Sequence, residues 1–229
     1  MKKVILILIL FLSCYLIYNF TNDSRIDYLV IGDGISSGVN KYGIKKYGYS
    51  DYVREYLSDN DRLSSYNDSF TGYDYRVTDL LRIIEYNDTK EIEGKNVNLN
   101  MLIKKADVIT LSVGMNELYY KINSDGVNVY NYVNALLEDM EHLLMHINKF
   151  NHKKVFVLGY YNIGSSQEEI NYINAKLKLI VDNQGFIYVD LSKIFDNNPI
   201  YFDNSDSFIP NNYGYLKISQ IIVEKLKNY

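Results

Sequence analysis

One turn near the start of the chain carries side chains that could do chemistry. An apolar run at residues 26–31 leads into Gly-Asp-Gly, centred on Asp33, and Ser36 and Ser37 follow closely. Such a run is typical of a buried parallel strand, and the residues that follow a parallel strand lie at the carboxyl edge of the sheet, where ligands bind. Hydroxyl and carboxylate groups in that place predict a nucleophilic or acid–base site.

Three later motifs are expected to converge on the same edge, because each lies at the end of a predicted strand or in the loop after one. Residues 67–72 read Asn-Asp-Ser-Phe-Thr-Gly. Residues 106–117 read Ala-Asp-Val-Ile-Thr-Leu-Ser-Val-Gly-Met-Asn-Glu. Residues 206–215 read Asp-Ser-Phe-Ile-Pro-Asn-Asn-Tyr-Gly-Tyr.

Together the four motifs resemble the sequence blocks of the SGNH (GDSL) hydrolases, in family order and with family-like spacing, from about residue 26 to the C-terminus. The resemblance implies a three-layer α/β/α fold with a flavodoxin-like, doubly wound parallel sheet of five strands. It also implies ester hydrolysis, in which a serine attacks the carbonyl, a histidine takes its proton and an aspartate orients the histidine.

The residues at the matching positions depart from that chemistry. Gly34 stands where the family has its serine nucleophile, and Ile209 stands where it has its histidine. Asp206 matches the orienting aspartate. The backbone N–H groups of Gly34 and Gly72 and the amide of Asn116 match the donors that bind the oxyanion. The resemblance therefore predicts a pocket lined by Asp33, Gly34, Gly72 and Asn116 that has lost its catalytic pair.

Three residue types keep alternative interpretations. Ser36 or Ser37 is a possible surrogate nucleophile, but a hydroxyl moved by two or three residues is displaced by far more than the roughly 1 Å that already impairs catalysis, so helix N-capping is favoured for both. Asn116 either lines the pocket or caps the helix after its strand. Glu117 stands where Asp is usual, and with Asp33 it could form an acid pair for glycoside hydrolysis.

The three histidines do not supply a base. His142, His146 and His152 all fall on one predicted helix or at its end, which runs away from the carboxyl edge. The first two, four residues apart, share a helical face and could bind a metal ion, but no third ligand is evident, so a solvated pair is favoured. No metal or cofactor is predicted.

Along the rest of the chain, apolar runs of strand length alternate with runs of helical period, which is the pattern of a doubly wound sheet. Strands are predicted at residues 26–31, 63–66, 108–113, 155–159 and 186–191. Helices are predicted at residues 50–57, 77–85, 130–150, 167–182 and 212–226. The chain of 229 residues thus divides into an N-terminal segment at 1–20, a linker at 21–25 and one domain at 26–229.

The N-terminal segment has the layout of an export signal, with Lys2 and Lys3 before an apolar run. Because the apolar character continues to Phe20, an uncleaved membrane anchor is favoured, with lipidation at Cys14 or cleavage and secretion as alternatives. The single cysteine excludes an internal disulfide. A net charge of −4 argues against a nucleic-acid partner.

These observations predict a membrane-anchored extracytoplasmic domain that no longer hydrolyses esters and binds a cell-envelope glycan or an acylated ligand. An ester hydrolase with Ser36 or Ser37 as nucleophile is the enzymatic alternative. A scaffold for protein interactions, with a vestigial pocket, is the third.

Overall fold

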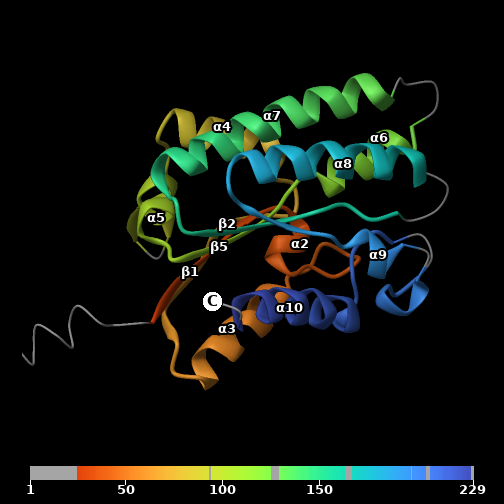
Figure 1. The fold of residues 1–229 in the computed structure, drawn as a ribbon. Coiled ribbons are helices and arrows are strands. Elements are labelled where there is room, and N and C mark those ends of the chain that lie inside the picture. Colours follow the sequence, from red (N-terminus) through yellow and green to blue (C-terminus); the bar gives the residue numbers. More distant parts are fainter. Residues whose placement is uncertain are drawn as a thin grey trace, which may run out of the picture.

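A computed structural model describes residues 25–92, 94–124, 129–162, 167–196, 198–204 and 207–227. A five-stranded parallel sheet, in the order β2-β1-β5-β6-β7, lies between two layers of helices (Figure 1). Its strands are β1 (Ile26–Gly32), β2 (Leu63–Thr71), β5 (Val108–Ser112), β6 (Lys154–Leu158) and β7 (Ile187–Val189). This is the predicted doubly wound α/β fold, with β1 next to the point where the strand order reverses.

The helices divide between the two faces of the sheet. On one face α3 packs against α10, and on the other α7 packs against α4 and α8 (Figure 1). The helices are α2 (Gly34–Ser37), α3 (Tyr49–Asp59), α4 (Val77–Glu85), α5 (Leu99–Lys105), α6 (Met115–Ile122), α7 (Val129–Phe150), α8 (Gln167–Asn183), α9 (Ser192–Phe195) and α10 (Asn212–Lys227), with a 3-10 turn, η1 (Pro199–Tyr201). A small antiparallel hairpin joins β3 (Thr89–Ile92) to β4 (Lys95–Asn98).

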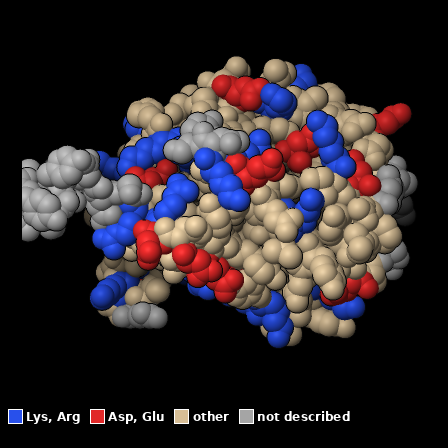
Figure 2. All heavy atoms as spheres, turned by 60° about the horizontal axis from the view of Figure 1, so that its bottom comes forward, with Lys and Arg blue, Asp and Glu red and all other residues tan. Residues whose placement is uncertain are grey.

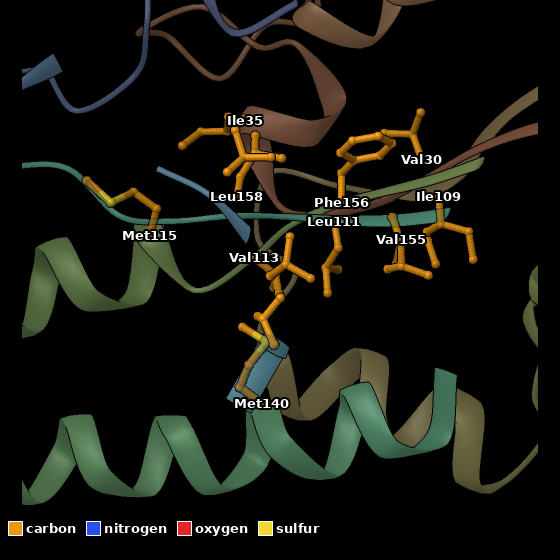
Figure 3. Packing of buried hydrophobic residues seen from close by; sticks show 14 of the residues in the cluster. Val30, Ile35, Ile109, Leu111, Val113, Met115, Met140, Val155, Phe156 and Leu158 are labelled. Atoms are coloured by element: carbon orange, nitrogen blue, oxygen red, sulfur yellow. The ribbon is translucent and has the colours of Figure 1, made fainter. Parts of the chain in front are cut away.

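The core explains why the central strands read as apolar runs. All five residues of β5 are buried, because helices cover both faces of the sheet. Phe156 and Leu158 point toward the face that carries α2, whereas Leu111 points toward α7, which contributes Met140 (Figure 3). This continuous core holds the ends of β1 and β5 rigidly beside each other.

The structure adds elements that the periodicity did not indicate. β2 extends to Thr71, through the motif at 67–72, because it continues to pair with β1 as far as Gly32. α5, α6 and the β3–β4 hairpin were also not predicted. The proposed anchor at 1–20 lies outside the described residues, among which no helix is long and apolar enough to cross a membrane.

Candidate functional site

The turn after β1 is built around the Asp33 carboxylate. Gly32 has a φ of 138°, and the Ser112 carbonyl oxygen lies 1.8 Å from where a Cβ would be, so no other residue fits there. Asp33 then caps α2 by accepting a hydrogen bond from the Ile35 N–H at 3.1 Å. Its second oxygen accepts from the Met115 N–H at 3.2 Å. Asp33 therefore joins the first motif to the third.

Burial governs the charge of this carboxyl group. Asp33 is only 1% exposed, and burial raises its pKa to about 7. The backbone N–H groups of Ile35, Met115 and Asn116 oppose this shift because they stabilise the carboxylate, and the nearby charge of Glu117 adds to it. Asp33 is thus an internal structural acid that titrates near neutral pH.

Gly34, the position of the expected nucleophile, is buried beneath two side chains. A Cβ built there would lie 3.0 Å from Val39 Cγ2 and 3.1 Å from Tyr73 Cδ2. The Tyr73 side chain is in turn hydrogen-bonded to that of Tyr120. A side chain at residue 34 would require Val39 and Tyr73 to shift by a few tenths of an ångström, and we call these two residues the plug.

Neither candidate surrogate serine is a helix N-cap, since Asp33 holds that role. Ser36 is fully buried, and its Oγ donates to the Ile31 carbonyl at 2.8 Å or to the Ser112 carbonyl at 3.1 Å. The same Oγ accepts from the Ser112 N–H at 3.2 Å. Ser37 Oγ donates to the Gly34 carbonyl at 3.1 Å. Both hydroxyls are therefore occupied by backbone contacts inside the fold.

The other two predicted oxyanion donors also have partners within the protein. The Gly72 N–H donates to the Gly32 carbonyl at 3.0 Å, and the Asn116 Nδ2 donates to the Tyr73 carbonyl at 3.1 Å. The Asn116 Oδ1 is buried and has no hydrogen-bond partner among the described residues. Asn116 thus fixes the loop that carries Tyr73.

Glu117 has a role that the sequence analysis missed. Its Oε1 accepts from the Val77 N–H at 3.2 Å, at the N-terminus of α4, and its Oε2 accepts from the Tyr132 hydroxyl at 2.7 Å. A carboxylate is stabilised at a helix N-terminus by the exposed N–H groups there. The extra methylene of Glu compared with the usual Asp, visible in the sequence, gives the reach for this link between α4, α6 and α7.

The loop before α10 closes the site with backbone contacts. Ile209 is 4% exposed, and its N–H donates to Ser207 Oγ at 3.1 Å. The Tyr161 hydroxyl donates to the Phe208 carbonyl at 2.7 Å, and the Tyr215 hydroxyl donates to the Val39 carbonyl at 2.7 Å. Tyr215 therefore ties this motif to the plug, whereas Asp206 lies outside the described residues.

Three hollows in the protein surface are lined by these motifs. The first, of about 470 Å³, includes Asn116 and Glu117 in its lining. The second, also about 470 Å³, includes Gly72 and Tyr73. The third, about 460 Å³, includes Val39 and the start of α10. Gly72 and Asn116, which were predicted to share one pocket, therefore line different hollows.

The histidines lie away from these hollows. His142 and His146 line a separate groove together with Glu85, whose Oε1 is 3.5 Å from His146 Nε2. His142 lies about 20 Å along α7 from the first residue of that helix. Among the described residues, no group of three or more His, Cys, Asp and Glu side chains could hold a metal ion.

Comparison with known proteins identifies the family. Residues 28–222 match the model of the GDSL-like Lipase/Acylhydrolase family. No curated protein matches the chain.

Solved structures share the fold at low sequence identity. A lipase from a goat rumen metagenome is 20% identical, with a TM-score of 0.67 over 86% of this chain and 95% of the lipase. The acetylxylan esterase Axe2 from Geobacillus stearothermophilus is 15% identical, with a TM-score of 0.67 over 87% of this chain and 93% of the esterase. Two variants of Axe2, in which a serine or a histidine is replaced by alanine, are described as catalytic mutants and also match, with TM-scores of 0.66 and 0.64. The family model spans most of the chain, and the chain therefore belongs to the GDSL-like lipase/acylhydrolase family.

Proposed function

We propose that this chain is a non-hydrolytic member of its family that binds a cell-envelope glycan at the carboxyl edge of the sheet. The observation that carries this proposal is Gly34, which stands at the position of the nucleophile and is packed beneath Val39 and Tyr73. Glycine supplies no nucleophilic side chain, and a serine hydroxymethyl group would need the plug to move. The chemistry of acyl transfer requires that attacking group.

The missing base supports the same conclusion. Ile209 accepts no proton, and the three histidines of the chain lie on α7 or just after it. A serine hydroxyl is a weak nucleophile unless an adjacent base takes its proton. That Axe2 variants altered at a serine or a histidine are called catalytic mutants is consistent with a need for both groups in a hydrolytic relative. Ser36 as an alternative nucleophile is disfavoured by its burial.

The hollow beside Asn116 has a lining suited to a sugar. Tyr75, Tyr120 and Tyr132 contribute aromatic rings that can stack on the apolar faces of pyranose rings. Arg76, Glu117 and Lys121 add charged groups that can hydrogen-bond to ring hydroxyls. An acyl chain would require an apolar channel, so this lining favours the glycan over the acylated ligand.

A labelling and binding experiment on the full chain in detergent tests this function. We expect no covalent adduct with a fluorophosphonate serine probe, no turnover of a short-chain acyl ester, and binding on an array of cell-envelope glycans. Tyr120→Ala should weaken that binding at least five-fold, whereas Tyr213→Ala, an exposed residue of the third hollow, should not. A probe adduct on Ser36 or Ser37 would overturn the proposal, as would the absence of binding to every glycan.

We also propose that residues 1–20 anchor the domain in a membrane, with Lys2 and Lys3 on the cytoplasmic side. The full chain should then sediment with membranes, resist extraction by high salt and retain the peptide from Met1 to Phe20. A soluble form that begins near residue 20 would reject the anchor in favour of a cleaved signal. A diacylglyceryl group on Cys14 would reject it in favour of a lipoprotein.

A further inference from the structure

Basic side chains gather at the amino edge of the sheet, opposite the candidate site. They lie at or just before the starts of β2, β1, β5 and β6, which are neighbours in the sheet, so they form one continuous surface. Figure 2 shows Lys and Arg concentrated at the left-hand end of the molecule, where β1 begins in Figure 1. We call this set the amino-edge cluster: Arg25, Arg62, Lys104, Lys105, Lys153 and Lys154.

Acidic residues neutralise only part of this surface. Lys105 Nζ is 3.3 Å from Asp27 Oδ1, and Lys153 Nζ is 2.5 Å from Asp107 Oδ1. In the sequence, Asp59 and Asp61 precede β2 and Asp23 precedes Arg25, so the six basic residues of the cluster stand against five acidic residues beside the same strand starts.

The fold itself explains some of the positive charge. Lys104 and Lys105 occupy the last turn of α5, where cations favour the negative end of the helix dipole. That account does not extend to Arg62 and Lys154, which precede or begin strands. Burial and the charge of Arg62 lower the pKa of Lys154, so these two cations lie close enough to repel each other.

We propose that the amino-edge cluster docks on the anionic headgroups of the bilayer in which the chain is anchored. This inference rests on the proposed anchor. Five linker residues, 21–25, span at most about 17 Å, so the anchor would hold the amino edge close to the lipid surface. Electrostatic attraction then acts within about one Debye length, roughly 8–10 Å at moderate ionic strength.

Docking sets the orientation of the candidate site. All strands of the main sheet are parallel, so their carboxyl ends point away from a membrane that contacts their amino ends. The seven residues of β1 separate the two edges by about 23 Å. The hollows beside Gly72 and Asn116 would therefore face outward from the bilayer, toward envelope polymers.

Lysine reactivity in vesicles tests the docking. The full chain is reconstituted either in phosphatidylcholine vesicles or in vesicles that also contain phosphatidylglycerol, acetylated briefly and mapped by mass spectrometry. We expect Lys104 and Lys153 to react at least three-fold more slowly in the anionic vesicles, and Lys41 and Lys46, in the loop after α2, to react equally in both. Each basic contact with an anionic surface changes binding by about five-fold. High salt should remove the protection.

Paired variants assign the effect to the cluster. Lys104→Glu combined with Lys153→Gln should abolish the protection of Lys105, whereas Lys41→Glu combined with Lys46→Glu should preserve it. Equal reactivity in both kinds of vesicle, with the chain still sedimenting with membranes, would overturn docking and leave the anchor standing. Failure to sediment would overturn the anchor. Equal protection by soluble polyphosphate without vesicles would reassign the cluster to a soluble polyanion and reject the lipid surface.

Discussion

Replacing Ser36 with alanine should lower the stability of the fold, because its hydroxyl serves the structure and is not a nucleophile. The Ser36 hydroxyl accepts a hydrogen bond from the Ser112 N–H and can donate one to the carbonyl of Ile31 or of Ser112. It also lies 3.3 Å from the Tyr49 hydroxyl, which continues the network to Thr110 at 3.3 Å. One side-chain oxygen thus joins α2, β1 and β5 in a place that water does not reach.

The magnitude follows from what the alanine leaves behind. The Ser112 N–H loses its acceptor, and a buried polar group without a partner costs about 1–3 kcal/mol. The lost donor to the two carbonyls adds about 1 kcal/mol, so we expect Ser36→Ala to lower the free energy of unfolding by about 2–4 kcal/mol. Ser37→Ala removes a single bond to the Gly34 carbonyl and should cost less than about 1 kcal/mol.

Urea denaturation followed by far-ultraviolet circular dichroism measures both variants. With a slope of about 3 kcal/mol per molar urea, Ser36→Ala should move the midpoint down by about 1 M, and Ser37→Ala by no more than about 0.3 M. An unchanged midpoint for Ser36→Ala would refute the structural role. If the wild type hydrolysed esters and Ser36→Ala abolished that activity while leaving stability unchanged, Ser36 would instead be identified as the nucleophile.

Three further predictions concern the rest of the site. Gly34→Ser combined with Ile209→His should show little activity toward p-nitrophenyl acetate until Val39→Ala and Tyr73→Ala together make room for the hydroxymethyl group; the same activity with the plug intact would contradict this. Neither single variant should be active, because nucleophile and base act as a unit. Asp33 has a pKa of about 7 in the folded state against about 3.9 unfolded, so the folded state binds the extra proton between pH 4 and 7, and wild-type stability should fall by up to about 4 kcal/mol as the pH rises through that window. Asp33→Asn should flatten this slope in urea titrations at several pH values, and an unchanged slope would assign it to another group. Asn116→Ala should lower the free energy of unfolding by about 1 kcal/mol, since it releases the Tyr73 carbonyl; full stability with loss of glycan binding would show instead that the amide serves the ligand.

The sequence predicted the scaffold well where packing on both faces produces long apolar runs. β1, β5 and α4 begin where predicted, because strand and helix periods are clear there. β2 was cut short because residues 67–71 are mostly polar, and an edge strand with partly exposed side chains has no apolar signature. β7 is shorter than the predicted strand at residues 186–191. Phe186 and Leu191 are buried in the core, and therefore apolar, although they lie outside the strand.

The site was predictable in its position but not in its contacts. Parallel strands bring the first and third motifs to one edge, as predicted, whereas the hydrogen bond from the Met115 N–H to Asp33 that joins them was not predicted. The plug could not be predicted, because Val39 and Tyr73 follow different strands and meet only over Gly34. Likewise, the partners of the Gly72 N–H and of the Asn116 amide are carbonyls fixed by the path of the loop, which no periodicity encodes.

The glycines of the motifs are required for different physical reasons. Gly32 and Gly114 have positive φ values of 138° and 95°, and the Ser112 carbonyl would collide with a Cβ at Gly32, so backbone geometry requires glycine there whatever the chemistry. At Gly34 the obstacle is only the side chains of Val39 and Tyr73, because no backbone atom lies within 3.5 Å of a built Cβ and the backbone conformation suits any residue. The backbone path therefore requires glycine at residues 32 and 114, whereas residue 34 is limited only by the side chains around it. For this reason the same backbone path can carry either a glycine or a serine at residue 34, and shortening the side chains of Val39 and Tyr73 should be enough to accommodate a serine.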